Sequence, residues 1–224
     1  MIGSGIFMLP TALAAFGGIS MIGWICASIG AILLAMVFGH LAKLAPQANG
    51  GPFAFTRLGM GDFPAYLVAW GYWVSLWCAN AAITMAVVGY LAVFFPILEQ
   101  SATIAIATGL GIIWLFTWIN SREIKTVVLV QAITTILKIV PILLIGIWGL
   151  FYIQAANFTP FNLSGESDLS VITTTTMLTF FAFLGMESAT IPSGSVKDSE
   201  NTVRKATIFG TLATIFIYLI SSVS

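Results

Sequence analysis

Long uncharged stretches dominate this sequence. Residues 1–42 contain no Asp, Glu, Lys or Arg, and a second stretch without these residues runs from Phe63 to Leu98. A helix that spans a bilayer needs about 20 apolar residues, so both stretches are long enough to cross a membrane. Backbone groups inside lipid must pair within the protein, and helices meet this requirement. The sequence therefore predicts an all-α membrane protein, built as a multi-span helical bundle.

Composition excludes several other classes of protein. Only 7% of the residues are charged and 59% are hydrophobic, whereas a soluble domain carries about 25% charged residues. The 8 Lys and Arg residues balance the 8 Asp and Glu residues, which argues against a nucleic-acid binder. Both cysteines, Cys26 and Cys78, lie in apolar runs and there is one His. We therefore expect no disulfide scaffold, metal site, cofactor or enzyme activity.

Turn residues and charges divide the chain into about seven predicted spans. Gly17-Gly18-Ile19-Ser20 is the expected turn within the first uncharged stretch. The third span is long enough that we expect it to be strongly tilted. The predicted spans are residues 1–15, 20–42, 65–94, 102–119, 126–153, 171–191 and about 204 to the chain end.

The connections between these spans differ in their basic residues. Lys and Arg occur in the connections 43–62, 120–125 and 193–205, whereas 96–101 and 154–170 contain none. Cytoplasmic connections are enriched in Lys and Arg. We therefore expect the three basic connections to be cytoplasmic, in a multi-pass protein of a bacterial-type inner (plasma) membrane.

Two predicted spans are interrupted. The first contains Gly3-Ser4-Gly5 and then Pro10, and the sixth contains Gly185, Glu187 and Ser188. A broken helix exposes backbone groups, which is tolerated in a membrane where they line a cavity or bind something. Such pairs of broken helices favour an inverted repeat with a mid-membrane substrate site. The alternative is that the glycines only permit close helix packing.

Several motifs carry a resemblance to a known family. Residues 1–10 and 183–189 resemble the first and sixth helices of amino acid–polyamine–organocation (APC) superfamily transporters. The sequence is most similar to the basic amino acid/polyamine antiporters of the arginine–agmatine type. Supporting matches are residues 50–55, Tyr72-Trp73, Asn80, 128–132 and 201–206.

The resemblance implies a leucine-transporter-type inverted repeat with broken helices 1 and 6. About seven of the family's roughly twelve spans would be present, in a chain truncated at both ends. Residues 1–153 would form the first five-helix repeat without its N-terminal end. Residues 154–170 would form an extracytoplasmic connection, and residues 171–224 the first two helices of the second repeat. A homodimer is left open.

The resemblance also implies substrate-binding residues. The backbone of Gly3, Ser4 and Gly5 would hold the substrate carboxylate, because glycine lets a ligand approach the backbone closely. In the third span, Asn80 would hydrogen-bond the substrate, with an interhelical hydrogen bond as the alternative. The remaining pocket and gate residues would be Ser75, Leu76, Tyr72, Phe181 and Leu184.

Phe181 departs from the arginine–agmatine type, which has a gating tryptophan at this position. An aromatic ring here can cover the substrate and contact a cationic group. Phenylalanine keeps the lid but offers a weaker cation–π surface, which is less suited to arginine. Leu184 would form the apolar floor beside it.

Two charged residues lie within predicted spans, where charge is costly and usually functional. The resemblance makes Glu187 a proton-linked or pH-sensing residue near a cationic substrate. Its alternative role is a hydrogen bond at a helix break. Lys138 would stand where sodium-dependent relatives hold a sodium ion. It could instead snorkel toward the interface or form an ion pair with Glu187.

The expected function is therefore secondary active transport of amino acids, as an exchanger of basic amino acids or their amine products. The open alternative is a sodium-independent, proton-coupled or facilitative transporter of neutral amino acids. A channel or an inactive fragment fits less well. The expected partners are the substrate and the lipid bilayer, without nucleic acid.

Two further expectations concern side chains near the span ends. The threonine run from Thr173 to Thr176 is expected to cap or back-bond its own helix. Aromatic residues near span ends are expected to anchor the protein at the membrane interface. They are Trp24, Trp114, Trp118, Trp148 and Tyr152.

Overall fold

The computed structural model describes most of the chain. The described residues are 2–3, 5–45, 48, 50–154, 158–191, 196 and 198–223. All regular structure among them is helical, as the uncharged stretches predict. The helices are α1 (Gly5–Ala14), η1 (Gly17–Ile19), α2 (Ser20–Leu44), α3 (Pro52–Met60), α4 (Asp62–Ala92), α5 (Ile97–Gln100), α6 (Ala102–Asn120), α7 (Ile124–Gly149), η2 (Leu150–Tyr152), α8 (Asp168–Phe181), η4 (Met186–Thr190) and α9 (Ser199–Val223).

Six helical stretches in the described part of the chain are long and apolar enough to cross a membrane. They correspond to the second through seventh predicted spans. The first predicted span contains α1, which has 10 residues. At 1.5 Å per residue this is shorter than the roughly 30 Å hydrocarbon core. The prediction of a long third span is confirmed, because α4 has 31 residues.

The connection 43–62 is less irregular than its Gly and Pro content suggests. It contains α3, which begins at Pro52. Proline is favoured at the first position of a helix because that position needs no N–H donor. The next helix, α4, begins at Asp62, where an acidic side chain stabilises the positive end of the helix dipole. The helix boundary therefore lies three residues before the predicted start of this span.

The chain divides into two compact units. The first, called here the core unit, comprises Met1–Val68 and Ile139–Ser224. The second, called the hairpin unit, comprises Ala69–Lys138. The hairpin unit contains most of α4, then α5, α6 and the first part of α7.

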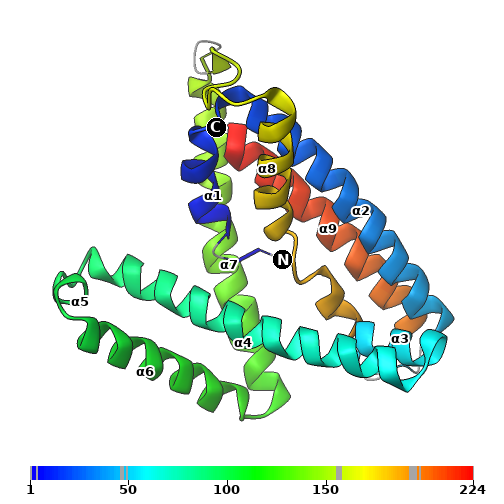
Figure 1. Cartoon of the computed structure of the whole chain (residues 1–224). Helices are drawn as coiled ribbons and strands as arrows, with labels where there is room; N and C mark the ends of the chain where they lie inside the picture. Colours follow the sequence, from blue (N-terminus) through cyan, green and yellow to red (C-terminus); the bar gives the residue numbers. More distant parts are fainter. Residues whose placement is uncertain are drawn as a thin grey trace. The chain divides into compact units, whose positions relative to one another are not determined.

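In the core unit, α2 packs along both α8 and α9 (Figure 1). Small residues at four-residue spacing allow this approach: Ala27, Ala31 and Ala35 of α2 are buried. At Gly23 a Cβ would collide with the Thr175 side chain and stand 2.8 Å from its backbone carbonyl carbon. The Thr179 hydroxyl lies 3.2 Å from the Gly23 carbonyl oxygen, across the same helix pair. Small side chains and hydroxyls thus hold these spans together.

Three aromatic side chains form the centre of the core unit. Trp24, Phe183 and Tyr218 are each 0% exposed. The ring centroid of Trp24 lies 5.9 Å from that of Phe183 and 5.3 Å from that of Tyr218. The prediction that Trp24 anchors the protein at the membrane interface is therefore wrong. Its position early in α2 faces neighbouring helices, and one sequence does not distinguish this face from the lipid face.

The threonine run behaves as predicted. Thr173 donates its hydroxyl to the Leu169 carbonyl, and Thr175 donates to the Val171 carbonyl, both at 2.8 Å. Each bond runs back four residues along α8. Threonine hydroxyls can therefore lie inside an apolar unit without unpaired donors.

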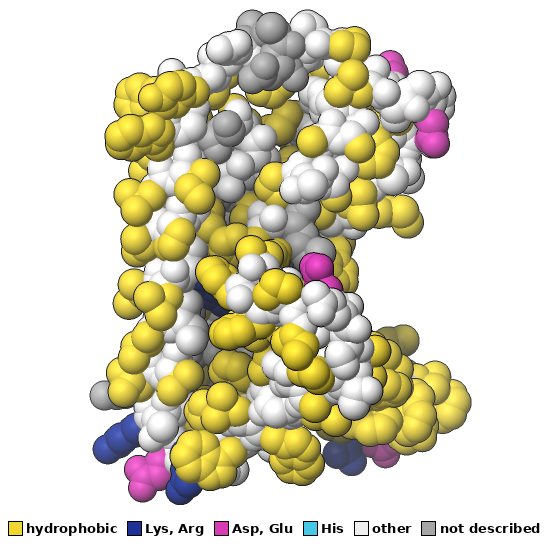
Figure 2. Space-filling model, turned by 90° about the vertical axis from the view of Figure 1, so that its left-hand side faces the viewer, with side chains coloured by type: hydrophobic (Ala, Val, Ile, Leu, Met, Phe, Trp, Pro, Cys, Tyr) yellow, Lys and Arg dark blue, Asp and Glu magenta, His cyan; other side chains and the backbone are white. Residues whose placement is uncertain are grey.

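The hairpin unit has a much smaller core. Its buried cluster consists of Val88, Ala92, Leu98 and Ala105. Most other large apolar side chains on α4 and α6 are exposed. Figure 2 shows that hydrophobic side chains cover much of the visible surface and that charged side chains are few. Apolar exposure on this scale is expected where helices contact lipid or further protein.

Candidate functional site

The predicted interruption of the sixth span is present. Helix α8 ends at Phe181, and a turn separates it from the short helix η4. Gly185 in this turn has a φ of 98° and adopts the left-handed conformation. Glycine adopts that conformation without the Cβ penalty that other residues incur. The sequence Ala182–Gly185 therefore forms a real break in the span.

Glu187 lies just after this break and is half-buried. The Gly185 backbone N–H donates to its Oε2 at 3.0 Å. The Thr190 hydroxyl donates to the Glu187 backbone carbonyl at 2.6 Å. The alternative role considered for Glu187, a hydrogen bond at the helix break, is thus seen directly. It leaves a transport role open, since a carboxylate accepts several hydrogen bonds.

The beginning of α1 lies against the same break. Gly5 is the first residue of α1, and a Cβ at this position would stand 3.7 Å from the Cβ of Ala182. Gly3 lies in a bend before the helix and is exposed. N–H groups in the first turn of a helix have no partner within the helix. The structure therefore brings Gly5 to the α8 break, while Ser4 lies outside the described residues.

Tyr218 of α9 contacts both segments and was missed by the sequence reasoning. Its hydroxyl donates to the Ala182 carbonyl at 3.1 Å and lies near the backbone of Gly3. The only sequence signal was a hydroxyl within an apolar span. That signal is weak, because tyrosine also occurs at membrane interfaces.

The two apolar site residues of the core unit differ from their neighbours in exposure. Phe181 is 63% exposed and Leu184 is 54% exposed. Between them, Ala182 and Phe183 are buried. Phe181 and Leu184 are thus available to contact a substrate or another protein segment, but their gate and floor roles remain predictions.

The predicted site residues of α4 share one part of that helix. Tyr72, Leu76 and Asn80 are spaced four residues apart, which places them on one face. Leu76 and Asn80 are exposed. The Ser75 hydroxyl donates to the Tyr72 carbonyl at 2.8 Å, so it is already engaged within the helix. These residues belong to the hairpin unit, and their role beside Gly3 remains a prediction.

Lys138 lies near the middle of α7 and is half-buried. This placement agrees with a charge deep in a candidate span. Lys138 belongs to the hairpin unit and Glu187 to the core unit. The ion pair between them, and the replacement of a sodium ion by the lysine, therefore remain predictions.

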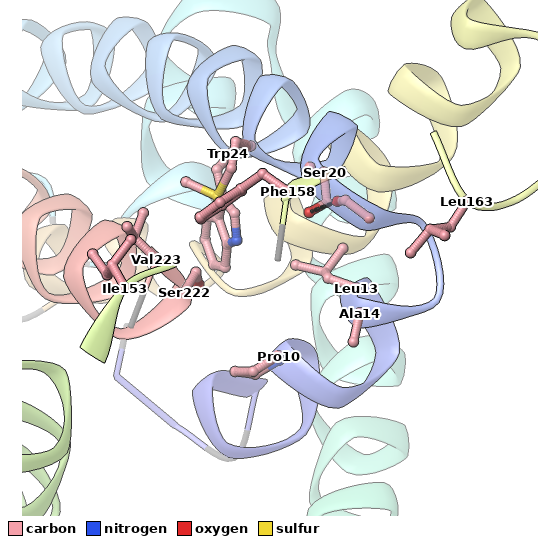
Figure 3. A pocket seen from close by; sticks show the side chains of 13 residues that line it. Pro10, Leu13, Ala14, Ser20, Trp24, Ile153, Phe158, Leu163, Ser222 and Val223 are labelled. Atoms are coloured by element: carbon pink, nitrogen blue, oxygen red, sulfur yellow. Dashed lines mark hydrogen bonds between the residues drawn. The ribbon is translucent and has the colours of Figure 1, made fainter. Parts of the chain in front are cut away.

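The core unit also contains a cavity of about 250 Å³ away from the predicted substrate residues (Figure 3). It is lined by α1, η1, α2, the end of α9 and connecting segments. Trp24 and Ser222 both line it. Within the described part of the chain, Trp24 Nε1 and Ser222 Oγ are buried without a hydrogen-bond partner. The sequence did not indicate these buried polar atoms beside the cavity.

The site as a whole is equipped for binding. It offers a carboxylate at Glu187, backbone groups near Gly3 and Gly5, and an aromatic ring at Phe181. Within the described ranges, no three His, Cys, Asp or Glu side chains are grouped closely enough to hold a metal ion. Backbone N–H groups at a helix start attract anions, and a carboxylate attracts a cation. Recognition of a small molecule that carries both charges by these groups remains a prediction.

Comparison with known proteins agrees with these features. The model of the amino acid permease family matches residues 1–224. A cadaverine/lysine antiporter of Escherichia coli (strain K12) is 36% identical over 223 residues, which cover 98% of this chain and 49% of the relative. The chain spans about half the length of the curated relatives it matches.

Two further relatives are also antiporters. An arginine/ornithine antiporter of Pseudomonas aeruginosa is 32% identical, with 100% of this chain and 48% of the relative covered. An arginine/agmatine antiporter of Chlamydia felis is 33% identical, with 99% of this chain and 48% of the relative covered. All three names pair a basic amino acid with a second basic compound.

Proposed function

This chain belongs to the amino acid permease family, and from that premise we propose that it forms part of a basic amino acid exchanger. The exchanger would move a basic amino acid one way across the membrane and an amine or a second basic amino acid the other way. The observation that carries the proposal is the break of α8, with Glu187 beside it and α1 packed against it. The names of the three antiporter relatives support the same substrate class.

The substrate carboxylate would bind at the start of α1. Gly3 and Gly5 leave the backbone accessible, and Ser4 would add a hydroxyl. The partial positive charge at a helix N-terminus stabilises an anion by about 0.3–1 kcal/mol at exposed sites and up to about 2 kcal/mol when partly buried. The α-amino group would bind near the α8 break, where helix-end carbonyls are available.

Glu187 would recognise the cationic side chain or couple its binding to a proton. A carboxylate within a membrane span is costly and is a functional candidate for that reason. Its hydrogen bond from Gly185 fixes one carboxylate oxygen at the break. A substrate cation can then approach a carboxylate of defined position.

Residues of the exposed face of α4 would also take part in substrate binding. Asn80 would hydrogen-bond the substrate, while Ser75 and Leu76 would line the pocket. Tyr72 and Phe181 would act as gates, and Leu184 would form the floor. Lys138 would be a fixed positive charge within α7 and would take part in coupling transport to protons or pH.

Membership of this family also supports a proposal for the architecture of the protein and its place in the membrane. We propose a leucine-transporter-type inverted repeat, with residues 1–153 in the first repeat, 154–170 as a connection and 171–224 in the second. The distribution of Lys and Arg supports cytoplasmic connections at 43–62, 120–125 and 193–205 in an inner membrane, and part of the last connection lies outside the described residues.

The test is exchange in proteoliposomes that contain the complete polypeptide carrying this sequence. Uptake of radiolabelled lysine or arginine is measured after preloading with cadaverine, ornithine, agmatine, leucine or buffer. The proposal predicts uptake that is stimulated only by internal basic compounds. Each measurement is made with and without sodium. If Lys138 takes the place of a sodium ion, uptake should not depend on sodium.

Two outcomes would contradict the proposal. Uptake of leucine without any preload would point to a transporter of neutral amino acids. Equal lysine uptake by loaded and empty vesicles would indicate a facilitative carrier or a channel. Protein-free vesicles and vesicles preloaded with sucrose serve as controls.

A further inference from the structure

Tyr218 has a hydroxyl in an unusual place. It lies on α9, near the C-terminal end of the helix, and it is 0% exposed. Its hydroxyl donates to the Ala182 carbonyl at 3.1 Å and lies near the backbone of Gly3. One side chain from α9 therefore contacts the end of α8 and the backbone before α1.

Both backbone partners lie at helix ends. Ala182 directly follows the last residue of α8, where carbonyl groups lose their intrahelical donors. Gly3 precedes the first residue of α1, where backbone N–H groups have no intrahelical acceptor. A phenolic hydroxyl has one hydrogen and accepting lone pairs. Because the Tyr218 hydroxyl donates to Ala182, its lone pairs are the part that can face the nearby Gly3 N–H.

The packing around the ring fixes where the hydroxyl points. The Tyr218 ring centroid lies 5.3 Å from that of Trp24 and 5.4 Å from that of Phe183. Both neighbours are fully buried, so the ring has no route to solvent. A hydrogen bond in such an apolar environment is strong, and its loss leaves buried groups unpaired.

We propose that Tyr218 is a positioning residue that fastens the break of α8 to the segment before α1. This role rests on the proposed function, because the two joined segments would hold the substrate together. Tyr218 itself touches no substrate. Its hydroxyl sets the position of Gly3, whose backbone would bind the carboxylate, relative to the α8 break. Substrates that carry a carboxylate should therefore depend on Tyr218 more than substrates that lack one.

The experiment compares Tyr218→Phe with the wild type in the complete polypeptide carrying this sequence. The substitution keeps the ring and removes only the hydroxyl. KM and maximal rate are measured in proteoliposomes for lysine and for cadaverine, which has no carboxylate. We expect the KM for lysine to rise about ten-fold, from the loss of a buried hydrogen bond, with less than about a two-fold change for cadaverine.

A matched control is Tyr152→Phe. Tyr152 is 68% exposed, so the removal of its hydroxyl should leave both KM values unchanged. A purely structural role for Tyr218 would lower the amount of folded protein and the maximal rate for both substrates alike. Equal changes in the two KM values would overturn the positioning role, provided that the wild type exchanges. Absence of exchange by the wild type would overturn the proposed function, and the positioning role with it.

A second measurement needs no variant and covers the case in which Tyr218→Phe does not fold. Hydrogen–deuterium exchange of the wild type is followed with and without lysine. We expect lysine to slow exchange together in peptides that cover residues 182–191 and 212–223. Protection confined to residues 182–191 would overturn the role of Tyr218.

Discussion

The core unit and the hairpin unit differ in how their helices are stabilised. In an apolar 18-residue stretch of the spans that contain α2 and α8, 33% of the residues are buried, against 11% in the spans that contain α4 and α6. The core unit encloses Trp24, Phe183 and Tyr218 completely. In the hairpin unit, the candidate residues Leu76 and Asn80 are exposed. Substitutions of the buried side chains of the core unit should therefore lower stability, and those on the exposed face of α4 should alter transport with little loss of stability.

The largest expected effect is that of Trp24→Ala. Removal of this fully buried side chain should destabilise the protein by about 3–5 kcal/mol. The matched substitution is Trp73→Ala in the hairpin unit, whose side chain is 57% exposed. It should cost less than about 1 kcal/mol. Thermal unfolding in detergent measures both, and equal losses would remove the contrast between the units.

Glycine substitutions provide a second test of the comparison. Gly23→Ala places a Cβ against the Thr175 backbone, which should cost about 1–3 kcal/mol through overpacking. Gly71→Ala meets nothing within 4 Å. It should be neutral, or stabilise by up to about 1 kcal/mol through helix propensity. Gly23→Ala should thus unfold at a lower temperature than the wild type and Gly71→Ala should not. A loss of stability in Gly71→Ala would indicate packing against α4 at this position.

Asn80→Ala tests whether the exposed face of α4 is functional. We expect its KM for lysine to rise about ten-fold, as for the loss of one hydrogen bond to a charged group, with an unchanged melting temperature. Cys78→Ala is the control, because Cys78 is exposed and lies off the face of Tyr72, Leu76 and Asn80. A fall in the stability of Asn80→Ala would favour the interhelical hydrogen bond instead.

Ser75→Ala should give the smallest effect. The Ser75 hydroxyl already donates to the Tyr72 carbonyl, so little of its bonding capacity is directed at a substrate. We expect a change of less than about two-fold in KM and less than about 0.5 kcal/mol in stability. Transport kinetics that depend strongly on this hydroxyl would show that it turns toward the pocket when substrate binds.

Sequence patterns predicted the parts of this molecule that depend on local chemistry. Charges and uncharged lengths located six helical spans, and glycine near Glu187 located the break of α8. Threonine back-bonding followed from residue type alone. These features depend on residues close in sequence, so a single chain is sufficient to predict them.

Features that depend on packing between distant segments could not be predicted. Trp24 was expected at the membrane interface and is buried, because its neighbours Phe183 and Tyr218 come from α8 and α9 regions far along the chain. The contact of Tyr218 with Ala182 joins residues 36 apart. The helix α3 within a connection rich in Gly and Pro was missed, since proline is favoured at a helix start as well as in turns.

In the proposed exchanger, Glu187 at the break of α8 would recognise the cationic side chain of the substrate or couple its binding to a proton. The most direct test of this role is counter-exchange of lysine for cadaverine by Glu187→Gln in the complete polypeptide. Glutamine retains an oxygen that can accept from Gly185, so the break should persist and the melting temperature should stay unchanged. Glu99→Gln, at an exposed glutamate, is the control. We expect Glu187→Gln to lower exchange at least about ten-fold, on the scale of a lost charge-assisted hydrogen bond, while Glu99→Gln exchanges like the wild type. Wild-type exchange by Glu187→Gln would contradict this role.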